Sequence, residues 1–282
     1  MSKRSLAFGV CLLAALLGLA FSAPANIAWG NGGYSSNPEF PDYGIHDWIA
    51  DKALAFQTAD VSFLLTTYHS DFLIGTEAPD NGEYVGDSYN HHVYYRSSGA
   101  LQADVGALRA REMYKSALDC LKASDYEHAA YYAGAMAHYI SDVGVYSHTM
   151  GASTDWGTST SHAAYEDHVH TMLGSLTAPQ TTALVWNDAY NVTISLAHKT
   201  TFGAGPIKPN TWMENNYNWN DPAFKSSCLE SLNESVRAVA SAFGLLTAQA
   251  GLTSVPEFEM GICLVLALTV ALFSSFKVRR SS

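Results

Sequence analysis

The chain has 282 residues, of which 48% are apolar and 15% are charged, and its formal net charge is −11. This composition excludes disordered, collagen-like and low-complexity proteins, and the length allows one domain or two with a large buried core. The excess of acidic residues argues against a basic groove that follows nucleic-acid phosphates. The 11 histidines exceed what a soluble surface needs, which indicates metal ligands.

Residues 1–28 are predicted to be an export signal. Lys3 and Arg4 form a positively charged start, and an uncharged, mostly apolar run extends from residue 6 to residue 21. Small residues then supply several cleavage points, the last of them after Ala28. The alternative is an uncleaved anchor helix.

The C-terminal residues 251–282 carry a second membrane-directed pattern. Residues 260–276 hold no charge and, at about 1.5 Å per residue, reach the short end of the length of a transmembrane helix. A basic tail at 277–280 follows, as expected on the cytoplasmic side. With the Pro-Glu-Phe at 256–258, this arrangement resembles the PEF-type sorting signals of archaeal surface proteins. That resemblance implies a sortase-like processing enzyme and a place at the outer face of the cell membrane, whereas the plainer interpretation is a membrane anchor.

Two cysteines, Cys120 and Cys228, lie between these ends. Export to an oxidising compartment permits a disulfide between them. The sequence leaves open whether they are paired or free.

Residues 29–250 are predicted to form a single all-α domain with long loops. Apolar residues recur at helical spacing in six stretches, which are 46–56, 101–121, 129–140 with capping residues at 124 and 125, 162–174, 180–199 and 222–248. Connectors rich in Gly, Asn and Pro separate them, at 29–45, 75–100, 149–161 and 201–221. Loops of this length commonly carry functional residues.

Histidines and carboxylates gather between residues 138 and 166. His138 and Asp142 are four residues apart and share one helix face, and His162 and Glu166 repeat this arrangement on another helix, with His148 between the pairs. Zinc takes imidazole nitrogen and carboxylate oxygen in catalytic sites, and helix bundles build metal centres from such pairs. A single pair is commonly a solvated or core hydrogen bond, but burying two pairs without a cation is costly. The pattern therefore predicts a metal site.

The full spacing, His-x3-Asp-x5-His-x13-His-x3-Glu, resembles that of the zinc-dependent phospholipases C and, more distantly, that of the single-strand-specific zinc nucleases. Similar segments lie upstream, around His46, at residues 75–80 ending in Asp80, and at residues 91–94. The last segment holds two histidines, and the aromatic residue that follows favours His92 over His91 without excluding His91. The resemblance covers about residues 29–169.

This resemblance implies a multi-helix domain around a multinuclear site with up to three zinc ions. The implied ligands are Asp80, His92, His138 and Asp142 for one ion; His148, His162 and Glu166 for a second; and Trp29, His46 and a bridging Asp142 for a third. The third ion requires cleavage directly after Ala28, because the terminal amino group of Trp29 is a ligand. Asp80 is implied to act as ligand and as catalytic base.

The implied activity is hydrolysis of a phosphodiester, with a phospholipid cleaved between glycerol and phosphate. Glutamate at the end of the His-x3 pair favours the phospholipases, because the nucleases carry aspartate there. Bound zinc would offset part of the −11 charge, so an anionic substrate is compatible with the composition. Two alternatives stay open, a zinc nuclease or other phosphodiesterase and a zinc-stabilised surface module without catalysis. Under the phospholipase interpretation no nucleic-acid partner is expected.

Overall fold

The computed structural model describes residues 43–58, 66–81, 85, 90–180 and 184–252. Within these residues the regular secondary structure is helical apart from one small antiparallel sheet, in which β1 (Tyr94–Tyr95) pairs with β2 (Leu101–Ala103). The helices are α2 (Ile45–Leu54), α4 (His69–Asn81), α5 (Val105–Lys122), α6 (Tyr126–Asp142), α7 (His162–Thr171), α8 (Ala189–Phe202), α9 (Asn210–Asn215) and α10 (Pro222–Gln249), with short 3-10 turns η1 (Tyr146–Thr149) and η2 (Leu173–Ser175). The predicted all-α class is confirmed.

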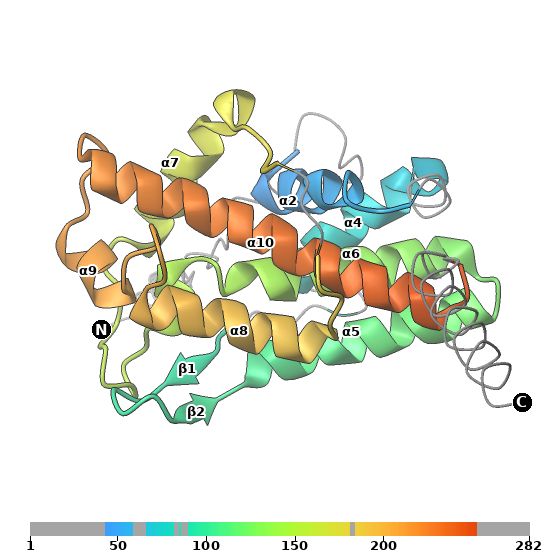
Figure 1. Cartoon of the computed structure of the whole chain (residues 1–282), viewed down its shortest axis with the longest axis horizontal. Helices are drawn as coiled ribbons and strands as arrows, with labels where there is room; N and C mark the ends of the chain where they lie inside the picture. The colour runs from blue at the N-terminus through green and yellow to red at the C-terminus, as the bar shows by residue number, and fades with distance from the viewer. Residues whose placement is uncertain (1–42, 59–65, 82–84, 86–89, 181–183, 253–282) are drawn as a thin grey trace, which may run out of the picture.

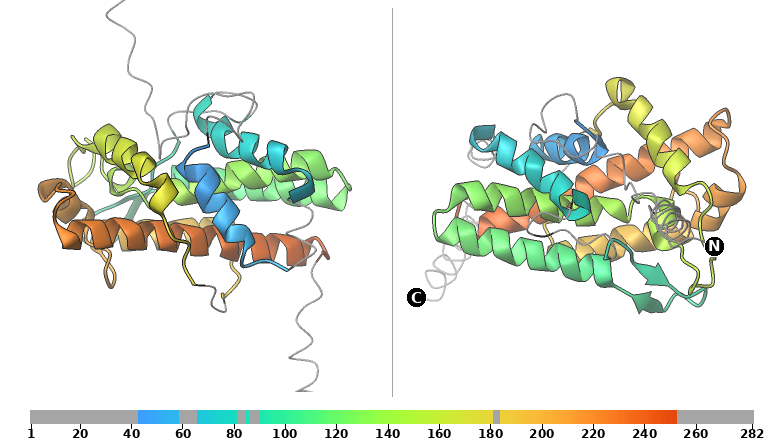
Figure 2. Two further views of the ribbon diagram at one scale, coloured as in Figure 1. Left: turned by 90° about the horizontal axis from the view of Figure 1, so that it is seen from above. Right: turned by 180° about the vertical axis from the view of Figure 1, so that it is seen from behind.

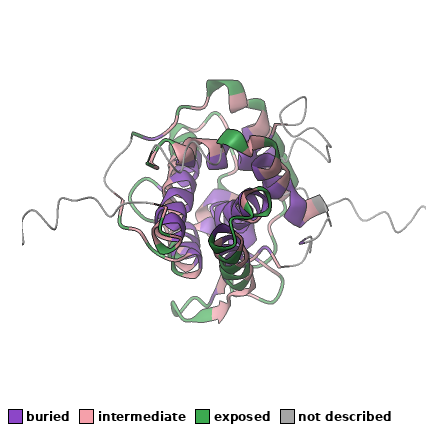
Figure 3. Ribbon diagram, turned by 90° about the vertical axis from the view of Figure 1, so that its right-hand side faces the viewer, coloured by how far each residue is buried: buried purple, intermediate pink, exposed green. Residues whose placement is uncertain are grey.

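Helix α6 lies at the centre of the described fold. Apart from Tyr132, every residue from Ala129 to Met150 is buried. Helices α4 and α5 pack along α6, and the view from behind in Figure 2 shows all three together. The long helix α10 crosses the front with α8 beside it (Figure 1), and both contact α6. Figure 3 shows the buried residues along the packed helices, with exposed residues mainly on the outer turns and connecting segments.

Two glycines allow α4 to lie unusually close to α6. A Cβ at Gly134 would lie 2.1 Å from the carbonyl oxygen of Phe72, and a Cβ at Gly75 would lie 2.0 Å from the carbonyl oxygen of Tyr131. Because these neighbours are backbone atoms, larger residues would force the helices apart. The close contact brings the last turns of α4 against the face of α6 that carries His138.

Most predicted helices are present, with shifted ends. Helix α5 begins at Val105 because residues 101–103 form β2 instead. Helix α8 begins at Ala189 rather than near residue 180, since the Asp188 side chain accepts a hydrogen bond from the Asn191 amide and so caps the helix. Helix α9 falls in the stretch predicted as a connector at 201–221, and the second half of α4 falls in the one predicted at 75–100, while the first half of α4 lies in a stretch with no predicted element.

Several predictions fall outside the described residues. These are the export signal at 1–28, Trp29, and the apolar stretch at 260–276. Among the described residues, no helix combines the length and the hydrophobicity needed to cross a membrane. Cys120 and Cys228 are both free thiols, so the disulfide is not formed.

Candidate metal centre

Four side chains from three segments meet in what we call the His91 cluster, defined as Asp80 from α4, His91 from the segment before β1, and His138 and Asp142 from α6. His91 Nδ1 lies 2.6 Å from Asp142 Oδ2 and 3.1 Å from His138 Nε2. His138 Nε2 lies 3.2 Å from Asp142 Oδ2, which confirms that the predicted pair shares one face of α6. Asp80 Oδ1 lies 3.6 Å from His91 Nδ1 and 3.7 Å from His138 Nε2. The potential donor atoms of all four residues therefore converge on one small volume.

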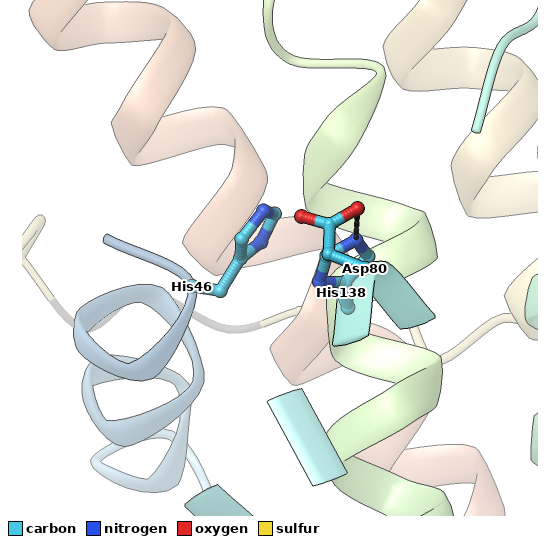
Figure 4. Close-up of side chains that lie close together, drawn as sticks. All are labelled: His46, Asp80 and His138. Atoms are coloured by element: carbon cyan, nitrogen blue, oxygen red, sulfur yellow. Dashed lines mark ion pairs between the residues drawn. The ribbon is translucent and has the colours of Figure 1, made fainter. Parts of the chain in front are cut away.

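His46 adds a second position beside this cluster. Its ring stacks on that of His138 with centroids 3.9 Å apart, and its Nε2 lies 3.3 Å from Asp142 Oδ1. Figure 4 shows His46 from α2, Asp80 from α4 and His138 from α6 directed toward one another. His46 Nε2 and Asp142 Oδ1 are buried and make no hydrogen bond to a described residue. Burying two hydrogen-bond acceptors without a donor costs free energy of folding, and a cation between the two atoms would satisfy both.

Hydrogen bonds on the far sides of the His138 and His46 rings set which nitrogen of each ring faces the cluster. His138 Nδ1 donates to the carbonyl oxygen of Thr76 at 2.6 Å, so its Nε2 is directed at the carboxylates. His46 Nδ1 lies 2.7 Å from Ser141 Oγ, which itself donates to the His138 carbonyl and therefore accepts from His46. Metal-binding histidines are commonly oriented in this way.

The charges of the cluster suit a cation. Burial, together with the neighbouring His138, lowers the pKa of His46 to about 4, so this ring is neutral and keeps a lone pair on Nε2. Burial disfavours a proton on His138, but the carboxylates of Asp142 and Asp80 outweigh it and raise the pKa of His138 to about 9. A positive charge is thus stabilised where these carboxylates meet, and a bound metal ion would displace that proton.

A second group, the His148 cluster, consists of His148, His162 and Glu166. His162 Nε2 lies 2.8 Å from Glu166 Oε1 and 3.1 Å from His148 Nε2, and the His148–Glu166 distance is 3.4 Å. Burial lowers the pKa of both histidines, that of His162 to about 4. His148 Nδ1 donates to the backbone carbonyl of His91 at 3.3 Å, so one residue links the two clusters. His162 retains 26% side-chain exposure and leaves this cluster accessible from solvent.

The structure brings His91, and not His92, into the first cluster, which corrects the preference for His92. Burial alternates along this extended segment, because His91, Val93 and Tyr95 are buried while His92 and Tyr94 are partly exposed. Successive side chains of an extended chain point to opposite sides. Val93 is apolar and faces the core, and His91 lies on the same side of the extended segment. Val93 is therefore the sequence signal that identifies His91 as the inward-facing histidine.

His92 has a different role in the structure. Its ring stacks on Tyr94 with centroids 5.4 Å apart, and its Nδ1 donates to the carbonyl oxygen of His148 at 3.3 Å. The contact fixes the loop beside η1 and so supports the position of His148.

Asp47 follows His46 directly, and its position in the sequence favours an exposed acid of a helix face over a support for the site, but the structure buries it behind the His91 cluster. Its Oδ1 accepts a hydrogen bond from the Thr76 hydroxyl at 2.5 Å, and its Oδ2 accepts one from the Gly44 amide at 2.8 Å. Because the Thr76 carbonyl accepts from His138, Asp47 connects α2, α4 and α6 behind the His91 cluster. No spacing rule distinguishes this aspartate from an exposed one, since its partner lies on a helix that the sequence did not predict.

The donor set and spacing fit zinc. Ligands at about 2.0–2.1 Å from a tetrahedral ion lie about 3.3 Å from one another. The donor separations measured in the two clusters run from 2.6 to 3.7 Å, on either side of that value. Imidazoles and carboxylates are also the ligands expected of zinc rather than of calcium or magnesium, which prefer oxygen alone.

Similarity to known structures supports the same fold. The alpha toxin of Clostridium absonum has 14% sequence identity and a TM-score of 0.56, with 81% of this chain and 66% of the toxin covered. The alpha-toxin of Clostridium perfringens, from avian strain SWCP, has 14% identity and a TM-score of 0.52, with 79% and 65% covered. This chain therefore spans slightly less than two thirds of either toxin. No curated protein matches it in sequence.

At 14% identity the solved structures show only a shared fold. A family model, in contrast, shows the family to which the chain belongs. The model described as zinc dependent phospholipase C matches residues 45–242. The match includes both clusters and every helix from α2 to α9, as well as most of α10. The chain therefore belongs to the zinc-dependent phospholipase C family.

Proposed function

We propose that this protein is a zinc-dependent phosphodiester hydrolase of the phospholipase C type that cleaves phospholipid headgroups. The observation that carries the proposal is the convergence of two linked clusters of buried imidazoles and carboxylates in a chain of this family. Both clusters have the donor types and separations that zinc requires. The fold and the family support hydrolysis of a phosphodiester, and we propose a phospholipid as the substrate.

The proposed ligands follow from the clusters. Asp80, His91, His138 and Asp142 would hold one ion, and His148, His162 and Glu166 would hold another. His46 and the second oxygen of Asp142 would hold a third, with Trp29 as the remaining ligand outside the described residues. Bound zinc supplies positive charge for the phosphate oxygens and makes water acidic enough to react near neutral pH.

The side chains differ in their access to a substrate. His138 and Asp142 are fully buried, whereas the side chain of Asp80 is 12% exposed. Asp80 therefore lies on the open side of its cluster, where a phosphodiester and the attacking water approach. We assign to its carboxylate the acceptance of a proton from that water, in addition to metal binding. The fully buried His138 and Asp142 would hold the metal ion and fix its position.

The location proposed for the protein is the outer face of the cell membrane. The charged start and apolar run at residues 1–28 support export, and the apolar stretch at 260–276 supports an anchor processed by a sortase-like enzyme. Placement there would bring the clusters close to phospholipid headgroups.

An assay on two substrates tests the proposal. The purified protein is given phosphatidylcholine vesicles or single-stranded DNA, each with zinc, with chelator, and with chelator followed by added zinc. We expect release of the phosphorylated headgroup that chelator abolishes and zinc restores. Activity on DNA alone would replace the lipid proposal by a nuclease. Tight zinc binding without turnover of either substrate would indicate a zinc-stabilised surface module.

A further inference from the structure

Helix α9 contacts the segment that presents His148. The side-chain amide of Asn210, at the start of α9, donates to the carbonyl oxygen of Thr149 at 3.3 Å and lies 3.2 Å from its hydroxyl. Asn210 is fully buried, so water does not compete for these bonds. Because Thr149 follows His148 directly in η1, the start of α9 fixes one side of the His148 cluster.

The other end of α9 contacts the segment that presents His162. The carboxylate of Glu214 accepts hydrogen bonds from Ser159 Oγ at 2.7 Å, Thr160 N at 2.7 Å, Thr160 Oγ1 at 2.6 Å and Ser161 Oγ at 2.9 Å. These residues directly precede His162, the first residue of α7. One carboxylate therefore binds all three residues that precede α7.

The His148 cluster depends on this arrangement because its ligands come from two separate segments. His148 belongs to η1, while His162 and Glu166 belong to α7 at the edge of the fold (Figure 1). Tyr165 packs against Tyr146 with ring centroids 5.0 Å apart and anchors the middle of α7. The start of α7, where His162 lies, is held by Glu214.

We propose that Asn210 and Glu214 are positioning residues that fix His162 against His148 and so set the zinc affinity of the His148 cluster. The inference rests on the proposed function in one respect, that this cluster binds zinc. Neither side chain touches the ligand atoms. Both act through the backbone next to a ligand, at Thr149 and at residues 159–161.

The chemistry of Glu214 explains why a carboxylate is needed. Burial raises the pKa of Glu214, but the hydrogen bonds from Thr160, Ser159 and Ser161 outweigh it and lower the pKa to about 2. The group is therefore ionised at neutral pH and only accepts hydrogen bonds. A Gln at this position keeps the shape but presents an NH2 group to donors, so part of the set must break.

Zinc affinity of the full chain, measured by competition with a chelator of known affinity, tests the inference. We expect E214Q to bind as many ions as wild type at saturating zinc, with one ion bound about tenfold more weakly. His148→Ala serves as the reference that lacks this ion even at saturation. The matched control is E230Q, because Glu230 pairs with Arg237 at 3.1 Å on α10, away from the cluster, and should leave every affinity unchanged.

The possible failures are distinguishable. Wild-type affinity in E214Q, with a lower melting temperature of the zinc-free protein, would show that α9 only stabilises the fold and would overturn the inference. If wild type bound no zinc, or His148→Ala kept every ion, the proposed function itself would fail. If E214Q did not fold, Thr160→Val would replace it, since it removes one exposed donor. It should weaken the same ion about threefold, and an unchanged affinity would overturn the inference.

Discussion

The contact between α4 and α6 predicts that Gly134→Ala damages both the fold and the site. The added Cβ would lie 2.1 Å from the Phe72 carbonyl oxygen and 2.9 Å from the Thr76 amide nitrogen, so the helices must separate by about 1 Å before the closer contact reaches 3.0 Å. Overpacking of this kind costs up to about 3 kcal/mol, and the better helix propensity of Ala offsets at most about 1 kcal/mol. We expect a loss of about 2 kcal/mol in the free energy of unfolding.

The same separation moves α4 away from His138. The Thr76 carbonyl that orients His138, now 2.6 Å from its Nδ1, would lose hydrogen-bonding distance, and Asp80 would recede from the His91 cluster. We therefore expect zinc affinity of that cluster to fall at least about tenfold. Urea unfolding of the chelator-treated protein and chelator competition measure the two effects. The control is Gly174→Ala, whose Cβ meets no atom within 4 Å. Equal stability and equal zinc affinity in the two variants would refute the reasoning.

Further predictions concern the ligands, their supports and pH. His148→Ala should remove one zinc ion per chain and most of the hydrolytic activity, and an unchanged zinc content by elemental analysis would contradict the assignment. Asp47→Asn should lower the free energy of unfolding by about 1–3 kcal/mol, because an amide cannot accept from both Gly44 and Thr76. The control is Asp119→Asn, which changes an exposed carboxylate of α5 that pairs with Lys115, and equal urea midpoints in the two variants would argue against the link. The low pKa of Glu214, about 2 against its usual 4.5, means that its stabilising effect is complete above pH 4.5 and is lost as the pH falls toward 2. The difference in melting temperature between wild type and E214Q should shrink over that range, and a constant difference would count against this role.

The helix-borne parts of the site were predictable because they depend on local geometry. Residues four apart on a helix share a face whatever surrounds them, so the His138–Asp142 and His162–Glu166 pairs are found as predicted. The apolar periodicity of α5, α6 and α10 is equally local, and their positions follow from it.

The parts that depend on distant contacts were not predictable in the same way. Helix α4 contains Gly75 and Pro79, which favour a loop locally, and Gly75 allows the close packing of this helix against α6. Helix α9 is short and lies in an Asn- and Pro-rich stretch, where hydrogen bonds to η1 and to the start of α7 decide the structure. The choice between His91 and His92 likewise depends on which side of an extended segment faces the core.

The central claim is that zinc occupies the two linked clusters. Crystals of the protein grown with zinc, with diffraction measured on both sides of the zinc absorption edge, test it directly. We expect anomalous peaks among Asp80, His91, His138 and Asp142, and among His148, His162 and Glu166. Anomalous peaks elsewhere in the molecule, with both clusters closed by hydrogen bonds alone, would contradict it.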